Sequence, residues 1–571
     1  MPWRLYFVGA FCVLLGLGLV GRLVFLQALD DAEFLQEQGE KRTIRNVAIP
    51  AHRGAITDRN GEPLAVSTPV ISLWVDPRKV DWDKKDIALL AEKLSVSSSE
   101  LQKRFELNSE LGRGFMYLRR HLSPSEADAV MALEVGGVKR EVEYRRFYPA
   151  GEVAAHITGF TGISDNGQEG MELAFDDWLT GKEGRKQVLK DLKGQVVRNL
   201  QQLESAEPGK DLALSIDLRL QYIAYRELKT AVKRHGAKSG SVVVLDTKSG
   251  EVLAVANQPS YNPNDRSSLE AAALRNRAIT DVFEPGSTMK PLTMIAALES
   301  GKYKPHTKID TSPGYMKVGS KTLVDPINYG EIDVTKVITK SSQVGTSKIA
   351  LSMEPDFIRD MFQRIGLGEN LGTGFPGEGV GVLPARRRWA PIEHVNLAFG
   401  YGLSLTALEL AQAYSVIANE GERRQVSLLR VDDEPEVRQV VDAKVVRDIK
   451  TMLQTVTGPK GTAKRAVIPA YSVAGKTGTV HKVGAKGYSE DRYISLFAGF
   501  APVDKPRVVT VVVVNEPTRG GYYGGEVAAP VFARVAAGAM RLLDVPPEAM
   551  QKRTAQRQSS SKTKKQGGPL S

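Results

Sequence analysis

A serine and a lysine three residues apart are the first candidates for chemistry in this chain of 571 residues. They are Ser287 and Lys290, where Pro285-Gly286 predicts a turn and a helical pattern begins at Thr288. This spacing places both side chains on one face of a helix. A neutral lysine amine can take the serine proton, and burial or nearby positive charge lowers a lysine pKa far enough for that. The pair therefore predicts a nucleophilic serine, with helix N-terminal amides that favour the developing negative charge.

The pattern of a serine followed three residues later by a lysine carries little information by itself. The chain repeats it at Ser559/Lys562 and at Ser561/Lys564, in a C-terminal segment rich in Ser, Gln, Thr and basic residues. Such a segment buries too little apolar surface to fold. Further motifs are therefore needed to support an active site at Ser287.

Two such motifs follow Ser287 along the chain. Lys340-Ser341-Ser342-Gln343 lies between two predicted helices, and Lys476-Thr477-Gly478-Thr479 begins a predicted strand. The glycines on both sides of Lys476-Thr477 would let the backbone of a ligand approach a sheet edge closely. A looser match, Lys248-Ser249-Gly250, precedes Ser287 and lies at the tip of a predicted hairpin, so we interpret it as a turn.

The hydrophobic pattern predicts the elements that must position these motifs. In chain order they are a hairpin (241–246 and 251–257), helices from 288 to about 418, three strands (473–480, 494–501 and 508–514) and a closing helix (about 527–543). Strands at both ends with helices between them imply an antiparallel sheet whose first and last strands meet. We therefore predict an α+β domain, layered α/β/α, preceded by a mixture of short strands and helices.

An apolar stretch from Leu5 to Leu26, interrupted by Arg22, would be about 33 Å long as a helix and could cross a bilayer. The alternative is a cleaved signal peptide, but Gln27-Ala28-Leu29 is a poor cleavage site. We therefore predict an uncleaved anchor. Basic Arg4 before it and acidic residues after it predict a cytoplasmic N-terminus and an exported remainder.

Composition excludes several classes of protein. With 42% hydrophobic and 25% charged residues, the chain is not disordered, collagen-like or a polytopic membrane protein. The single cysteine, Cys12, excludes an intrachain disulfide, and seven scattered histidines predict no metal site. Part of the net charge of +11 lies in residues 551–571, which carry six basic and no acidic residues. We interpret this tail as solvated and disordered, since no motif supports a nucleic-acid arm.

Three motifs in this order, on a helix N-terminus, an inter-helix loop and an edge strand, are typical of penicillin-recognising serine enzymes. The chain resembles the class B penicillin-binding proteins, and within them the peptidoglycan D,D-transpeptidases of cell division. The resemblance extends from the anchor to about Val545. Further segments that carry it are Arg53-Gly54, Asp58-Arg59-Asn60-Gly61, Arg146-Phe147-Tyr148-Pro149, Ala155-His156, Gly170-Met171-Glu172, Phe375-Pro376-Gly377-Glu378, Gly400-Tyr401-Gly402 and Tyr522-Tyr523-Gly524-Gly525.

The resemblance implies a division of the chain into five parts. They are a cytoplasmic N-terminus (1–4), a transmembrane anchor (5–26), a mixed α+β pedestal of the dimerisation type (27–225), a transpeptidase domain (226–545) and a basic tail (546–571). The Arg, Asp and Gly residues of the pedestal motifs are interpreted as turn and interdomain salt-bridge positions rather than as a second active site.

The resemblance also implies a role for each motif residue. Ser287 would be the acylated nucleophile, Lys290 the base for acylation, and Ser341 a proton relay to the leaving group. Lys476, Thr477 and Gly478 would bind the terminal carboxylate of the donor peptide and align its backbone as an added strand. The backbone amides of Ser287 and Thr479 would form the oxyanion hole. No cofactor or metal is implied.

One residue departs from the family pattern. The second motif of the family usually ends in Asn, whereas this chain has Gln343. Gln keeps the amide but adds one methylene, and a displacement of about 1 Å in a tuned site can cost about 10²-fold in rate. The departure concerns the binding of the donor and of β-lactams, not the nucleophile.

The expected reaction is cross-linking of septal peptidoglycan. Ser287 would attack a D-Ala-D-Ala stem and release D-alanine, and an amine of a neighbouring stem would then resolve the acyl-enzyme. β-Lactams would trap the same serine. The resemblance further implies a single-pass protein of the bacterial inner membrane, with a periplasmic catalytic domain. Its expected partners are a polytopic septal glycosyltransferase and other division proteins, contacted through anchor and pedestal.

Three alternatives remain open from the sequence. A D,D-carboxypeptidase or β-lactamase would pass the acyl group to water, although no segment matches the Glu that class A β-lactamases use for this. A bifunctional enzyme would need a glycosyltransferase module ahead of Ser241, and no paired carboxylates mark one. A non-catalytic division scaffold is favoured only by Gln343.

Overall fold

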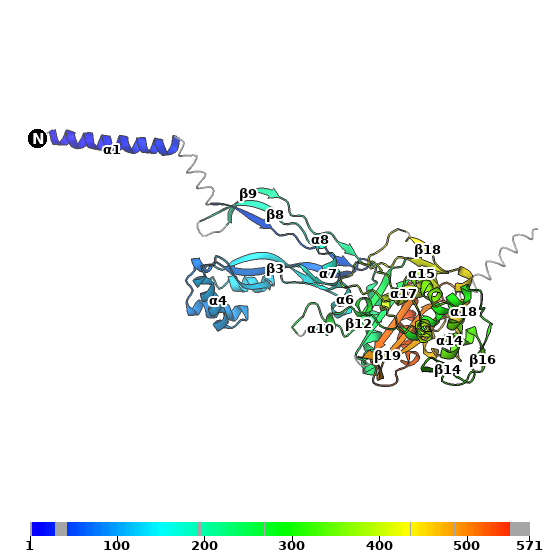
Figure 1. Cartoon of the computed structure of the whole chain (residues 1–571). Helices are drawn as coiled ribbons and strands as arrows, with labels where there is room; N and C mark the ends of the chain where they lie inside the picture. The colour runs from blue at the N-terminus through cyan, green and yellow to red at the C-terminus, as the bar shows by residue number, and fades with distance from the viewer. Residues whose placement is uncertain are drawn as a thin grey trace, which may run out of the picture. The chain divides into compact units, whose positions relative to one another are not determined.

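The computed structural model of the chain describes residues 3–28, 43–191, 196–267, 269–433, 435–484 and 487–548 (Figure 1). The chain forms two compact units, one built from 1–54, 69–144 and 180–210 and the other from 55–68, 145–179 and 211–571. Residues 55–68 and 145–179, which the sequence assigns to the pedestal, therefore belong to the same unit as the three motifs. Residues 549–571, most of the predicted tail, lie outside the described residues.

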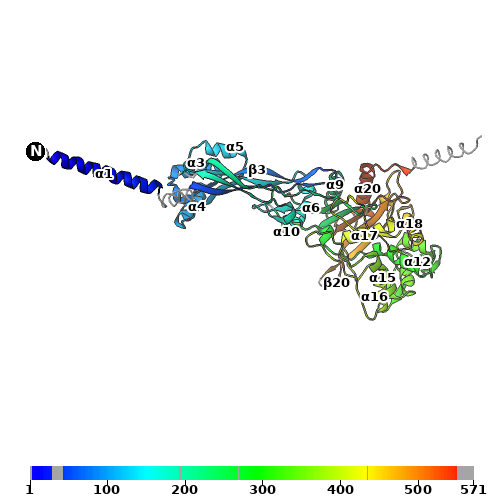
Figure 2. The same cartoon turned by 90° about the horizontal axis from the view of Figure 1, so that it is seen from above.

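The N-terminal helix α1 (Trp3–Ala28) is apolar, and its residues 3–25 are exposed (Figures 1 and 2). The stretch Trp3–Phe25 is long and apolar enough to cross a membrane, by length and composition. Cys12 lies within this stretch. The predicted apolar helix at 5–26 is thus present, and it indicates a single-pass membrane anchor.

The first unit contains a small sheet and a separate small core. Its antiparallel sheet has the order β1 (Ile44–Ile49), β8 (Gly184–Lys190), β9 (Val196–Glu204). The core lies among α3 (Lys84–Leu94), α4 (Ser98–Glu110), α5 (Pro124–Met131), β4 (Met116–Leu122) and the second half of β3 (Pro63–Val75). Leu73, Leu90 and Leu94 are fully buried there. On α3 the buried side chains recur at helical spacing, which explains the face that it packs inward.

The second unit begins with short elements that carry the pedestal motifs. These are β2 (Ile56–Thr57), the first half of β3, α6 (Ala155–Thr158), β6 (Phe160–Thr161), β7 (Gly167–Glu169), α7 (Gly170–Ala174), α8 (Asp176–Leu179) and β10 (Leu212–Ala213). Residues 145–147 of β5 (Lys139–Phe147) also belong to this unit. The Asp58 carboxylate accepts from the backbone N–H groups of Asn60 (2.7 Å) and Glu62 (2.9 Å), which closes the predicted turn. The Arg146 guanidinium forms a buried ion pair with Glu172 at 2.6 Å. Asp58 is thus a turn residue, as predicted, whereas the Arg146–Glu172 pair lies within the predicted pedestal and is not an interdomain salt bridge.

A five-stranded antiparallel sheet forms the centre of the second unit (Figure 1). Its order is β12 (Val252–Gln258), β11 (Ser239–Asp246), β21 (Val508–Asn515), β20 (Gly487–Ala501), β19 (Ala474–Gly484). The predicted pairing of first and last strands is confirmed, since β11 pairs with β21 with Val242 opposite Val512. All eight residues of β11 are buried, and successive side chains point to opposite faces, so both faces of the sheet are covered.

Helices cover the sheet and complete the predicted α/β/α layering. α9 (Leu218–His235) and α20 (Ala529–Leu542) pack against each other and against the sheet, and α17 (Ala407–Ala418) packs against its middle strands. The remaining helices of this unit are α10 (Ala271–Leu274), α11 (Arg277–Thr280), α12 (Lys290–Glu299), α13 (Val334–Lys340), α14 (Gln343–Leu351), α15 (Pro355–Ile365), α16 (Pro391–Phe399), α18 (Ala443–Thr457) and α19 (Gly524–Val527). Together these elements place the first two motifs beside the edge strand β19, which carries the third motif.

The region from 288 to 418 is less helical than the sequence predicted. Four short strands interrupt it: β13 (Lys308–Asp310), β14 (Tyr315–Val318), β15 (Lys321–Val324) and β16 (Glu331–Asp333). They form two antiparallel pairs, β13 with β16 and β14 with β15. Gly314, Gly319 and Gly330 adopt positive φ around these strands, a conformation that ends helices and favours turns. The small strands matter because Asp325, directly after β15, reaches the second motif.

Candidate active site

Two glycines that touch each other set the position of Ser287. Ser287 lies in a 3-10 turn, η3 (Gly286–Met289), which leads directly into α12. Gly286 adopts φ +54°, and its N–H donates to the Gly400 carbonyl at 3.0 Å. A β-carbon on Gly286 would lie 2.4 Å from Val480 of β19, and one on Gly400 would lie 2.5 Å from the Gly286 carbonyl. Only glycine at both positions brings the serine turn this close to the strand.

Lys290 begins α12 with its ammonium group inside the protein, 1% exposed. The Nζ atom donates to the Ser341 carbonyl at 2.6 Å and to the Ser341 hydroxyl at 3.2 Å. Burial lowers the pKa of Lys290 to about 7, and the nearby Asp325 carboxylate opposes that shift. A substantial fraction of the amine is therefore neutral near pH 7, the state that a base requires.

Ser341 joins the second motif to the third. It adopts a left-handed backbone (φ +57°) after α13, directly before α14 begins. Its hydroxyl oxygen accepts from Lys290 and also from the Nζ of Lys476, at 3.0 Å. Lys476 is fully buried, and burial together with the charge of Lys290 holds its pKa well below the usual range. Two lysines of depressed pKa thus meet at one hydroxyl, an arrangement suited to proton transfer.

The Ser287 hydroxyl has no hydrogen bond to another protein group among the described residues, and its side chain is half-buried. It faces the cleft, while the Lys290 amine is engaged with Ser341. Catalytic hydrogen bonds are often long or misaligned before substrate binds. Direct proton transfer from Ser287 to Lys290 therefore stays a prediction.

The third motif lies on β19, the outermost strand of the central sheet. β20 occupies one side of β19, with Thr477 opposite Phe497, which leaves the other edge available to an extended ligand. Gly524 packs so closely that an added β-carbon would lie 2.4 Å from the Gly478 carbonyl, and its N–H donates to the Thr479 hydroxyl at 3.0 Å. The Tyr-Tyr-Gly-Gly segment thus supports the strand that the sequence assigns to the donor.

The motif side chains surround one cleft of about 480 Å³. Ser287, Ser341, Gln343, Thr477 and Thr479 all line it. Lys290 and Lys476 lie beneath that lining, fully buried. The structure therefore brings together the residues that the sequence selected from three separate segments.

Gln343 is the first residue of α14, and its side chain is exposed to the cleft. Its backbone N–H donates to the Asp325 carboxylate at 2.5 Å. Its side-chain amide forms no hydrogen bond to another protein group within the described residues, so the amide is free to meet a ligand.

Asp325 contacts the second motif and was not revealed by the sequence. Its carboxylate, 3% exposed, accepts from the Ser342 hydroxyl at 2.5 Å and from the Gln343 N–H at 2.5 Å. It therefore caps the N-terminus of α14, where a negative charge is favourable. Its charge also acts on Lys290. No motif marks this aspartate, because it reaches the site only through the hairpin that the helical prediction missed.

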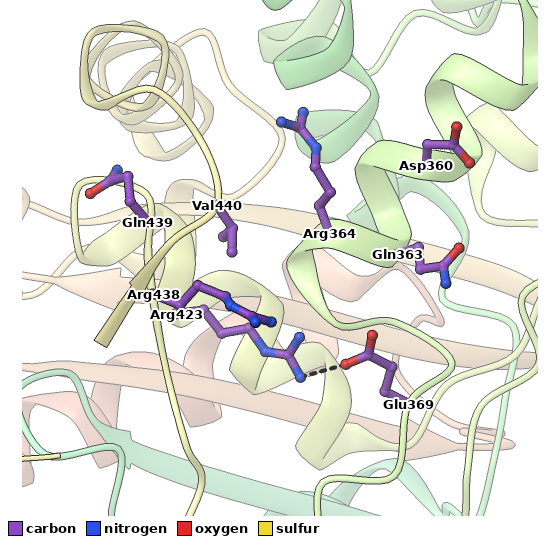
Figure 3. Close-up of a pocket in the computed structure, with 8 residues that line it drawn as sticks. All are labelled: Asp360, Gln363, Arg364, Glu369, Arg423, Arg438, Gln439 and Val440. Atoms are coloured by element: carbon purple, nitrogen blue, oxygen red, sulfur yellow. Dashed lines mark ion pairs between the residues drawn. The ribbon is translucent and has the colours of Figure 1, made fainter. Parts of the chain in front are cut away.

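A second cleft, of about 500 Å³, lies elsewhere in the second unit (Figure 3). Its lining includes Arg364, Arg423 and Arg438, and Figure 3 shows Arg423 paired with Glu369, at 2.8 Å. No serine, threonine or lysine is among its lining residues. Among the residues that the structure describes, no three His, Cys, Asp or Glu side chains cluster to hold a metal. This second cleft therefore offers no hydroxyl nucleophile and no lysine base.

Comparison with known sequences gives matches over nearly the whole chain. Residues 240–537 match the penicillin binding protein transpeptidase domain, and residues 48–214 match the penicillin-binding protein dimerisation domain. The probable peptidoglycan D,D-transpeptidase PbpC of Pseudomonas aeruginosa is 46% identical over 550 residues, covering 96% of this chain and 97% of that protein. The peptidoglycan D,D-transpeptidase FtsI of Escherichia coli K12 is 42% identical, covering 94% of this chain and 92% of that protein.

Solved structures resemble the fold as well. Penicillin-binding protein 3 of Mycobacterium tuberculosis, in complex with aztreonam, superposes with a TM-score of 0.68 at 28% identity, covering 88% of this chain and 99% of that one. The transpeptidase domain of Burkholderia pseudomallei penicillin-binding protein 3 has a TM-score of 0.54 at 40% identity, covering 58% of this chain and 97% of that one.

Proposed function

The chain belongs to the class B penicillin-binding proteins and is a serine-type peptidoglycan D,D-transpeptidase, and we propose that it forms cross-links through an acyl ester on Ser287. The observation that carries this proposal is the hydrogen-bonded series Lys290–Ser341–Lys476, whose central residue Ser341 lines the same cleft as Ser287. Its two relatives named above include the transpeptidase FtsI, in line with a role in the septal wall during cell division.

In the acylation step, the Ser287 oxygen attacks the penultimate carbonyl carbon of a donor D-Ala-D-Ala stem, and the Lys290 amine takes the serine proton. The backbone N–H groups of Ser287 and Thr479 stabilise the oxyanion of the tetrahedral intermediate. The C–N bond then breaks, and the departing D-alanine receives a proton through Ser341, whose hydroxyl contacts both lysines. The depressed pKa of Lys290 supports the base role.

In the second step, the amine of a neighbouring stem attacks the ester carbonyl. The acceptor nitrogen loses a proton to the site, the C–O bond to Ser287 breaks, and the serine oxygen regains a proton from Lys290. The new amide is the cross-link. Because a β-lactam presents a strained amide to the same serine, it forms an ester that the site resolves slowly.

Donor recognition follows from the exposed edge of β19. A stem peptide laid along this edge in extended form would pair with the backbone around Thr477 and Gly478. The Thr477 hydroxyl lines the cleft and would receive the terminal carboxylate, while buried Lys476 contributes positive potential from below. The Gln343 amide would contact the donor backbone in place of the family's Asn.

We further propose that the apolar helix α1 crosses the bacterial inner membrane with residues 1–4 in the cytoplasm. The transpeptidase domain (226–545) would then act in the periplasm, and the pedestal (27–225) with the anchor would contact a polytopic septal glycosyltransferase and other division proteins. Arg4 before the helix supports this orientation.

Labelling with a fluorescent penicillin tests the proposed function. The purified full-length chain should form a covalent adduct that Ser287→Ala abolishes. Ser559→Ala, which removes one of the two Ser-x-x-Lys matches in the C-terminal segment, should leave labelling intact. No adduct on the unsubstituted chain would favour a non-catalytic scaffold, and an adduct that survives Ser287→Ala would refute the assigned nucleophile. Rapid release of hydrolysed drug would indicate a hydrolase instead.

A further inference from the structure

Basic side chains are prominent in the lining of the active-site cleft. Lys464 and Arg465 line it from the short turn η4 (Lys464–Ala466), and Lys340 lines it from the end of α13. Lys464 and Arg465 are exposed, and neither forms an ion pair within the described part of the chain. Glu526 is the acidic residue in that lining. The cleft therefore has a positive excess that its own carboxylate does not balance.

The segment that carries Lys464 and Arg465 is fixed to the donor strand. The Thr462 and Thr477 hydroxyl oxygens are hydrogen-bonded at 2.9 Å. A β-carbon on Gly525 would lie 2.2 Å from the Thr462 carbonyl, so this segment packs tightly against the turn that supports β19. Ala463 and Ala466, on either side of the two cations, are fully buried. The backbone that carries the two charges is thus held next to Thr477.

The lysine of the third motif does not itself reach the cleft. Lys476 is fully buried and donates to the Ser341 hydroxyl and to the Thr477 carbonyl, each at 3.0 Å. Thr477 lines the cleft, whereas Lys476 is not among the lining residues. A carboxylate placed at Thr477 would therefore lie beside the segment after Thr462, which carries the exposed cations Lys464 and Arg465.

We propose that Lys464 and Arg465 form a subsite that attracts and holds the carboxylate at the departing end of the donor stem. This inference rests on the proposed function, because it presumes a donor laid along β19 with its terminus at Thr477. Exposed ion pairs are individually weak, so two of them should change the specificity for a carboxylate by about three- to tenfold. Such an effect should also weaken at high salt, since both cations are exposed.

Two matched substrates separate this subsite from general effects on catalysis. Both are N-acyl-D-alanine thioesters, one with a leaving group that ends in a carboxylate and one with a leaving group that ends in a neutral amide. Thiol release by the full-length protein gives kcat/KM for each. Lys464→Ala with Arg465→Ala should lower kcat/KM about three- to tenfold for the carboxylate substrate and by less than about twofold for the amide. Added salt should likewise reduce the preference of the unsubstituted protein for the carboxylate substrate over the amide substrate.

A second Lys-Arg pair provides the control. Lys233 and Arg234 are exposed in the last turn of α9, so Lys233→Ala with Arg234→Ala removes the same charge from a surface that does not line the cleft. This variant should keep the preference for the carboxylate substrate. Three results would overturn the subsite. The first two are an equal loss of kcat/KM on both substrates and no loss on either. The third is the same loss in the control variant. Absence of any turnover that depends on Ser287 would instead refute the proposed function, and equal thermal unfolding temperatures of all variants would exclude misfolding.

Discussion

The Nζ atom of Lys290 lies 2.6 Å from the carbonyl oxygen of Ser341 and 3.2 Å from its hydroxyl oxygen. The same hydroxyl accepts from Lys476 at 3.0 Å, so one serine separates two buried lysines. Two positive charges this close in a desolvated site oppose each other. Burial lowers the pKa of both lysines, and the charge of Lys290 lowers that of Lys476 further, so the protonation of the site is the first property to test.

Acylation should depend on pH through Lys290. The pKa of Lys290 is lowered to about 7 by burial, and only the neutral amine can accept the serine proton. The rate of penicillin acylation should therefore fall about tenfold for each pH unit below that value and level off above it. Stopped reactions with fluorescent penicillin from pH 5.5 to 9 would measure this profile. A rate that stays flat down to pH 5.5 would contradict the base role.

Asp325→Asn should shift that profile as well as destabilise the fold. Its carboxylate raises the pKa of Lys290, so its loss should lower that pKa and move the rising limb of the acylation rate to lower pH. Loss of its charged hydrogen bonds to Ser342 and Gln343 should cost about 1–3 kcal/mol of unfolding free energy. Thermal unfolding and the acylation profile measure the two effects separately.

Asp333→Asn is the matched control for Asp325. Asp333 caps α13 by accepting from the Lys336 N–H at 2.7 Å, but it is not among the charges that act on Lys290. This variant should leave the acylation profile in place. A purely structural role for Asp325 would give two variants that differ in stability but share one pH profile.

Ser341→Ala should slow acylation by about 10²-fold, because it removes the hydroxyl proposed to carry the proton to the leaving group. The backbone carbonyl of residue 341 would still accept from Lys290, so the fold should persist. Mass spectrometry of the adduct over time would give the rate. Acylation at the unsubstituted rate would exclude Ser341 as the relay.

Gln343→Asn should retain or increase the acylation rate, since the exposed amide has no protein partner to lose within the described residues. Gln343→Ala should lower the rate, because it removes the amide from the cleft. Penicillin acylation kinetics on both variants distinguish the two effects. A large loss in the Asn variant would show that Gln343 is not a displaced equivalent of the family's Asn.

Gly400→Ala should lower the acylation rate, although Gly400 does not line the cleft. The added β-carbon would lie 2.5 Å from the Gly286 carbonyl, and φ is +80° there. Displacement of the serine turn should reduce acylation strongly, while the strained backbone should cost about 1–3 kcal/mol of stability. Gly402→Ala is the control, because φ is +69° but nothing lies within 4 Å of its added carbon. Equal acylation by the two variants would mean that backbone strain, not the contact with Gly286, is decisive.

The sequence alone predicted the sheet and the motif residues because each has a local signature. Alternating or continuous β-branched stretches mark strands such as 508–514, and the turn before Ser287 marks the start of a helix. The order of three short motifs was enough to identify the family. The helical prediction failed between 308 and 333, because short strands ended by glycines have too few residues for a periodic pattern.

What makes these residues a site was decided only by the tertiary structure. The depth at which Lys290 and Lys476 are buried, and hence the low pKa of each, depends on atoms packed from distant segments. The contacts of Asp325 with Ser342 and of Gly400 with Gly286 join residues that no local pattern connects. Sequence spacing determines which residues share a helix face or a strand, but desolvation and contact between elements exist only once the chain has packed.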